Sequence, residues 1–162
     1  MTQHDPTTYA DLSQGRIRHI DFHIRVDFST NTLAIKASYQ LDAPPHGPLF
    51  LDTFKIELHS AHANGRALTW EFDTHDESLG SRLHLKGLED DASFTLEFHT
   101  SPDASALQWL TAEQTLGGKH PFLYSQCQSI QARSVFPCQD TPSVRFTFTA
   151  EVEAPKGLTA VM

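Results

Sequence analysis

Neutral hydrogen-bonding side chains are concentrated in residues 125–146, which read SQCQSIQARSVFPCQDTPSVRF. This stretch holds four glutamines and both cysteines of the protein, together with Pro137 and Pro142. A carboxamide donates and accepts hydrogen bonds without adding a charge, which suits a ligand-binding loop as well as a buried turn. The composition therefore predicts either a ligand-binding loop or an elaborate corner placed before a strand.

Cys127 and His120 form a conceivable thiol–imidazole pair for nucleophilic catalysis. Such proximity in sequence is common by chance, and no G-x-S-x-G, G-x-x-x-x-G-K-[ST] or dinucleotide-binding motif occurs. We therefore expect no catalytic residues in this chain. Cys127 and Cys138 could form a disulfide, but two reduced thiols in a cytoplasmic protein are the simpler interpretation.

Ten histidines raise the question of a metal site, which strand geometry can test. His19 and His23 lie four residues apart on a predicted strand, hence about 13 Å apart, too far to share an ion. His59 and His62 would point to opposite faces if their strand continues without interruption. No H-E-x-x-H or C-x-x-C motif occurs. We therefore expect solvated surface histidines and no metal ligands.

Strict alternation of apolar and polar residues identifies the elements that must position these side chains. Residues 19–28 place Ile20, Phe22 and Ile24 on one face and charged or polar residues on the other, as a half-buried strand requires. Further strands are predicted over residues 32–41, 49–53, 54–61, 67–73, 81–86, 93–100 and 143–154. Residues 42–48 read as a loop and 63–66, with Asn-Gly, as a hairpin turn, whereas 107–124 look irregular.

No segment shows a helical period over three turns, so the fold class is all-β. Short strands in this number predict a multi-sheet, β-sandwich-like domain dominated by antiparallel pairing. At 162 residues we expect a single domain, residues 1–162.

The formal charge of −8 argues against a nucleic-acid partner, and no basic stripe suggests a membrane surface. No apolar run approaches the roughly 20 residues of a membrane span, and the polar start of the chain shows no signal peptide. We therefore expect a cytoplasmic protein.

Several short motifs resemble one known family. LQWL (107–110), SQCQ (125–128), AR (132–133) and PCQDTPS (137–143) occur in the order and spacing found in the N-terminal domain of the leukotriene-hydrolase and aminopeptidase-B branch of zinc aminopeptidases. FLDTFKIEL (50–58) fits a strand of the same domain. The resemblance is specific over the last third of the chain and weaker over the rest.

The resemblance implies a saddle-shaped all-β module that scaffolds a catalytic domain of the same polypeptide. In that family the zinc ligands and the G-x-M-E-N loop lie in the catalytic domain, and neither motif occurs here. We therefore expect that the catalytic domain is absent, that this chain alone is inactive and holds no cofactor, and that zinc belongs to the full-length parent. The parent would remove N-terminal residues from peptides.

The resemblance also implies that Gln126 and Gln128 lie on a loop in the substrate cleft, with Gln128 closest to the N-terminus of the peptide. The rest of the stretch reads as a corner. Arg133 would pair with a buried carboxylate or with carbonyls, Asp140 would form an Asx-type turn, and Cys138 would be a small buried residue. An alternative is a stand-alone, non-enzymatic β-sandwich that acts as a binding module.

Overall fold

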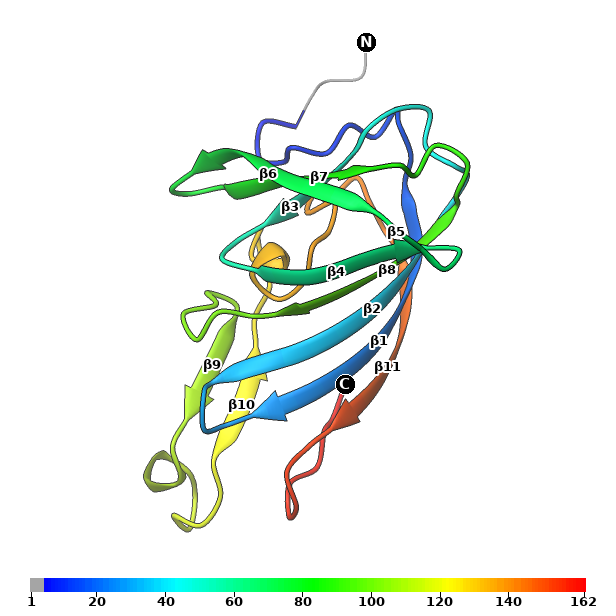
Figure 1. Ribbon diagram of the computed structural model, residues 1–162. Helices are drawn as coiled ribbons and strands as arrows, with labels where there is room; N and C mark the ends of the chain where they lie inside the picture. The colour runs from blue at the N-terminus through cyan, green and yellow to red at the C-terminus, as the bar shows by residue number, and fades with distance from the viewer. Residues whose placement is uncertain (1–4) are drawn as a thin grey trace.

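A computed structural model describes residues 5–162, and strands form nearly all of its regular structure (Figure 1). The elements in chain order are β1 (Ile17–Asp27), β2 (Thr32–Leu41), β3 (Leu49–Thr53), β4 (Glu57–Ala63), β5 (Arg66–Ala67), β6 (Thr69–Asp76), β7 (Gly80–Lys86), β8 (Ser93–His99), β9 (Leu107–Leu110), the 3₁₀ turn η1 (Ala112–Gln114), β10 (Phe122–Ser125), the 3₁₀ turn η2 (Ala132–Ser134) and β11 (Thr147–Glu153).

The strands form three sheets. A six-stranded sheet has the order β11-β1-β2-β8-β4-β5, a three-stranded sheet has the order β3-β7-β6, and β9 and β10 form a hairpin. Within residues 5–162 the β1–β11 pair is the one parallel pairing, and all other strand pairs are antiparallel. The large sheet is strongly curved (Figure 1). The prediction of a saddle-shaped, multi-sheet and mainly antiparallel all-β fold is confirmed.

Alternation along the strands builds the core between the sheets. In β2 every second side chain is buried, from Leu33 to Leu41, and Tyr39 is fully buried and stacks on Phe94 of β8 with ring centroids 4.6 Å apart. The three-stranded sheet contributes buried leucines from β3 and β7, including Leu51 and Leu83. The opposite face of the large sheet carries polar and charged residues, because a half-buried strand must expose its alternate positions.

Most predicted strands are present, with shifted ends. β4 begins at residue 57 rather than 54, the predicted strand 67–73 is divided between β5 and β6, and the last strand begins at Thr147 rather than at 143. The hairpin turn at 63–66 is confirmed, since Asn64 and Gly65 both have positive φ.

The irregular assignment of residues 107–124 is wrong, because β9 and the first residues of β10 lie within it. Each of these strands has only four residues, too few for a clear alternation to show in the sequence. Between residues 5 and 162, no helix has the length and apolar character that crossing a membrane requires.

Candidate functional site: the glutamine loop, its corner and an apolar groove

Arg133 is the centre of the corner that follows the glutamine loop. It lies in η2, is 1% exposed, and its Nε donates to Asp140 Oδ2 at 3.0 Å. Its Nη1 donates to the Leu79 carbonyl at 2.8 Å and its Nη2 to the Thr7 carbonyl at 2.7 Å. Arg133 Nη1 also lies 3.9 Å from Asp52 Oδ1. Arg133 therefore binds both carboxylates and carbonyls, as its type and position predicted.

Asp52 at the end of β3 joins the corner to the N-terminal segment. Its carboxylate is fully buried and accepts hydrogen bonds from Thr8 Oγ1, from the Tyr9 N–H at 2.7 Å and from the Asp140 N–H at 2.9 Å. Such charge-assisted bonds satisfy a carboxylate that has no access to water. Three segments far apart in the sequence thus meet at one buried ionic network.

Asp140 does not form the predicted Asx-type turn. Its carboxylate accepts the backbone N–H of Arg133, seven residues earlier, at 3.2 Å as well as the Arg133 side chain. Burial raises the pKa of the Asp140 carboxyl, and the adjacent Arg133 guanidinium opposes that shift by stabilising the carboxylate. The Asp140 carboxylate therefore binds the side chain and the backbone of Arg133 across the loop rather than the backbone of the residues that follow it.

Residues 137–139 fix the corner to the large and small sheets. Tyr39 Oη donates to the Pro137 carbonyl at 2.8 Å, and Cys138 and Asp52 exchange two backbone hydrogen bonds. The Gln139 side chain bonds the backbone of Gly15 and of Ile17 at the start of β1. Cys138 is buried as predicted.

The loop that precedes this corner exposes both predicted substrate-binding glutamines. The Gln126 N–H donates to the Ala106 carbonyl at 2.8 Å, and Gln126 Oε1 accepts the Gln128 N–H at 3.0 Å. Within residues 5–162 the exposed carboxamide of Gln128 has no hydrogen-bond partner. Gln126 therefore stabilises the loop, whereas the Gln128 side chain is free to meet a ligand.

Cys127 lies between the two glutamines as a free, partly buried thiol. Burial and then the nearby Asp140 carboxylate raise the pKa of the Cys127 thiol. A thiol with a raised pKa is a poor nucleophile because the thiolate is the reactive form. Nor does any hydrogen bond in the described chain link Cys127 to His120, so nothing supports a catalytic thiol pair.

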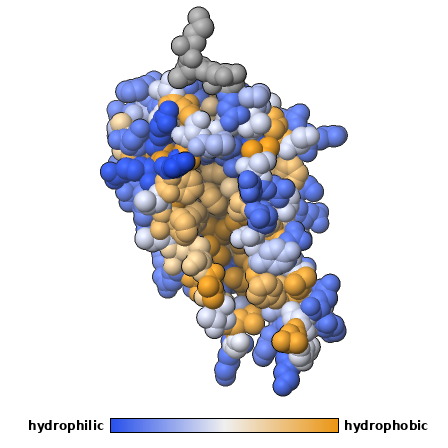
Figure 2. Space-filling view, turned by 180° about the vertical axis from the view of Figure 1, so that it is seen from behind, coloured by the Kyte–Doolittle hydropathy of each residue, from blue (hydrophilic) through white to orange (hydrophobic). Residues whose placement is uncertain are grey.

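An apolar groove of about 670 Å³ adjoins the glutamine loop. It lies between the apolar face of the large sheet, the β9–β10 hairpin and the last residues of the chain, and Cys127 is part of its wall. Figure 2 shows hydrophobic residues gathered in a hollowed band on the side opposite to that of Figure 1. The exposed large hydrophobic residues that line the groove are Phe122, Tyr124, Phe148, Val161 and Met162.

The groove was not predicted from the sequence, although aromatic residues of its wall recur at every second position. Phe122 and Tyr124 alternate along β10, and the irregular assignment of residues 107–124 concealed this pattern. An apolar patch of this kind on the surface marks a site of interaction with another protein segment or ligand.

The fold and these motifs define the N-terminal module of a peptidase. Residues 16–162 match the Peptidase M1 N-terminal domain, and the chain belongs to this family.

Leukotriene A-4 hydrolase of Xenopus laevis is 36% identical in an alignment of 167 positions, gaps included. The alignment covers 98% of this chain and 27% of that protein. Leucine aminopeptidase 2 of Saccharomyces cerevisiae is 36% identical over 160 residues, 94% of this chain and 24% of that protein. The structure of native yeast LTA4 hydrolase superposes with a TM-score of 0.87 at 34% identity, over 95% of this chain and 25% of that one. The chain thus spans about a quarter of the length of these relatives.

Proposed function

We propose that this chain is the N-terminal domain of a zinc-dependent aminopeptidase that removes N-terminal residues from peptides. In this role residues 1–162 form a single domain that scaffolds a catalytic domain of the same polypeptide. The observation that carries the proposal is the combination of a hydrogen-bonded, exposed glutamine loop and an adjoining exposed apolar groove. A docked domain would cover the groove and bring its cleft to the loop.

Gln128 is the residue proposed to contact the substrate. A carboxamide oxygen can accept from the ammonium group of a peptide N-terminus while its NH₂ group donates to a carbonyl. Gln126 would act through Gln128, since its side chain holds the Gln128 backbone in place. Both residues are neutral, so neither competes with the charges of a catalytic centre.

The residues of this chain do not fit the catalytic zinc ion of such an enzyme. No H-E-x-x-H motif occurs in the 162 residues, so its ligands and general base would lie in the catalytic domain. The contribution of this domain to the enzyme is therefore to bind and position the substrate. Both cysteines are free, which agrees with the reducing cytoplasm proposed as the location.

The test is a Gln128→Ala substitution in the polypeptide that joins this chain to a segment with H-E-x-x-H. Loss of a hydrogen bond to a charged group costs about 1.5–3 kcal/mol, so kcat/KM for an aminoacyl reporter should fall about 10- to 100-fold. Zinc content, measured by atomic emission, should stay at the wild-type value.

Gln108→Ala supplies the matched control, because Gln108 is an exposed glutamine on β9 outside the loop. Unchanged kinetics in Gln128→Ala would refute the substrate-contact role. A reading frame that never reaches H-E-x-x-H would refute the enzyme assignment and leave the groove as the docking site of a stand-alone binding module.

A further inference from the structure

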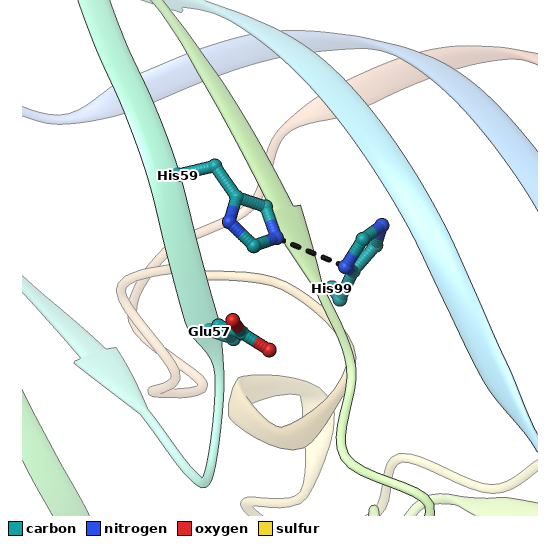
Figure 3. Close-up of side chains that lie close together, drawn as sticks. All are labelled: Glu57, His59 and His99. Atoms are coloured by element: carbon teal, nitrogen blue, oxygen red, sulfur yellow. Dashed lines mark hydrogen bonds between the residues drawn. The ribbon is translucent and has the colours of Figure 1, made fainter. Parts of the chain in front are cut away.

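Three metal-ligating side chains gather on the polar face of the six-stranded sheet. Glu57 and His59 of β4 lie beside His99 at the end of β8, and Figure 3 shows a nitrogen of one imidazole ring directed at a nitrogen of the other. One ligand atom from each of the three residues lies within 4.8 Å of the other two. His59 Nε2 and His99 Nδ1 are 2.9 Å apart and share a hydrogen bond.

A β-bulge creates this arrangement. Glu57 pairs directly with His99 and Leu58 with Phe98, but Glu97 pairs with Ser60, so His59 is the extra residue in β4. A bulge places two residues of one strand opposite one residue of its partner and redirects the side chain. It also brings His59 and His62 to the same outward face, whereas an uninterrupted strand would have put them on opposite faces.

The separation of the two ring nitrogens matches shared coordination of one ion. The usual zinc–imidazole distance is about 2.05 Å. At that distance two nitrogens that subtend a right angle at the ion lie about 2.9 Å apart, and two that subtend the tetrahedral angle lie about 3.3 Å apart. The observed 2.9 Å equals the right-angle value, so the rings would move apart slightly to reach tetrahedral coordination. To bind the ion, the ring that now donates this hydrogen bond would carry its proton on its other nitrogen, so that both facing nitrogens present a lone pair. Glu57 would supply a third, anionic ligand.

In a second cluster of similar composition, cationic side chains already bind the carboxylates. Glu71, Asp73 and His84 also lie within 4.8 Å, but Lys86 binds Glu71 at 2.8 Å and Arg82 binds Asp73 at 2.8 Å. These cations lower the pKa of both carboxyl groups and occupy their oxygens. Glu57, in contrast, forms no ion pair within residues 5–162.

The surroundings of the first cluster leave space for further ligands. Two open hollows of about 460 and 450 Å³ meet at His99, so water can complete the coordination shell. The nearest lysines are engaged elsewhere, since Lys55 pairs with Asp103 and Lys36 with Glu97. Arg25 lines both hollows and is a cation that opposes binding.

We propose that Glu57, His59 and His99 form a binding site for one divalent transition-metal ion of the zinc class. Imidazole nitrogen combined with a single carboxylate is a donor set that suits zinc, cobalt, nickel and copper rather than magnesium or calcium. The expectation of solvated surface histidines rested on pairs within one strand, whereas this cluster forms between two strands. The proposal does not depend on the proposed function.

The test is a calorimetric titration of the 162-residue chain with Zn²⁺ in a weakly coordinating buffer at pH 7.5. We expect one ion per chain, and Co²⁺ in place of Zn²⁺ should give visible d–d absorption bands. His59→Ala and His99→Ala should each weaken binding at least about 10-fold, since each removes one of three protein ligands. The thermal transition of each variant, measured without metal, checks that it is folded.

Two control variants locate the ion. His62→Ala removes an exposed histidine of the same strand and face, and His84→Ala removes the histidine of the second cluster, so both should leave the affinity unchanged. The proposal is overturned if wild-type chain takes up no Zn²⁺ at millimolar concentration. It is equally overturned if folded His99→Ala binds as tightly as wild type, or if His84→Ala abolishes binding.

Discussion

Arg133 shows at the scale of one residue how the corner holds the glutamine loop. Its side chain is almost completely buried, and its donors reach Asp140, Leu79 and Thr7, which come from three separate segments. The Arg133 carbonyl accepts the N–H of Phe54 at 2.8 Å, just after β3. A planar group with five fixed donors can join that many segments, and lysine, with one point charge, cannot.

Replacing Arg133 with methionine should therefore destabilise the whole domain. The fully buried carboxylate of Asp52 and the partly buried one of Asp140 would lose their cation, and breaking a buried pair costs about 3–5 kcal/mol. The free energy of unfolding, measured by urea titration, should fall by that amount. Arg145→Met, at an exposed arginine without an ion pair in residues 5–162, should change it by less than about 0.5 kcal/mol. A loss below about 1 kcal/mol in Arg133→Met would contradict the central role of this residue.

At the scale of elements, the β6–β7 turn is fitted against the end of β3. Gly80 opens β7 with φ +80, and a Cβ at this position would lie 2.1 Å from the Thr53 carbonyl oxygen. Gly65, in the β4–β5 turn, has a similar φ of +75, but nothing lies within 4 Å of its Cβ position. The two glycines share the same backbone requirement and differ in the space around them.

Alanine substitutions at these two glycines should separate backbone strain from steric exclusion. Gly65→Ala should cost about 1–2 kcal/mol, the usual cost of a positive φ for a residue with a Cβ. Gly80→Ala carries the same cost and must also displace the backbone of β3, so its free energy of unfolding should fall by clearly more. Equal losses in the two variants, measured by urea unfolding, would show that the β6–β7 turn adjusts freely.

An element can be predicted from the sequence when its own residues determine it, and not when distant contacts do. β1 and β2 have long alternating patterns, and Asn64-Gly65 has its own turn chemistry, so both are evident from sequence. The parallel pairing of β1 with β11 joins residues more than 120 positions apart, and nothing local indicates it. The four-residue strands β9 and β10 are stabilised by packing of Trp109 and Leu123 on the core rather than by their own pattern.

The same distinction applies to the candidate sites. The residue types of 125–146 indicated a polar loop and corner, and the corner chemistry of Arg133 followed from its donors. The Glu57–His59–His99 cluster depends on strand register and on a bulge, which the sequence does not display. The difference between Gln126 and Gln128 likewise depends on a single hydrogen bond within the loop, from the Gln128 N–H to the Gln126 side chain.

At the scale of the whole molecule, the three sheets share a core that contains two buried acidic groups of high pKa. Tyr39 and Cys138 meet beneath the corner, and burial raises the pKa of the phenol well above 10.0 and that of the thiol well above 9.0. In the folded protein both groups keep their protons at a pH where the unfolded chain has released them. The folded state then binds more protons, so the free energy of unfolding falls as pH rises.

This linkage predicts a progressive loss of stability in alkaline solution. The contribution is fully present below pH 9, the ordinary thiol pKa, and is lost as the pH rises from there toward the raised values in the folded protein. Each buried group adds a slope of about 1.4 kcal/mol per pH unit above its ordinary pKa. Urea unfolding from pH 7.5 to 10.5 should show this decline, and Cys138→Ala or Tyr39→Phe should reduce its slope.

Tyr39→Phe also removes the hydrogen bond to Pro137, which lowers stability equally at every pH and leaves the slope as the diagnostic quantity. A wild-type slope in both Tyr39→Phe and Cys138→Ala would assign the alkaline transition to other groups.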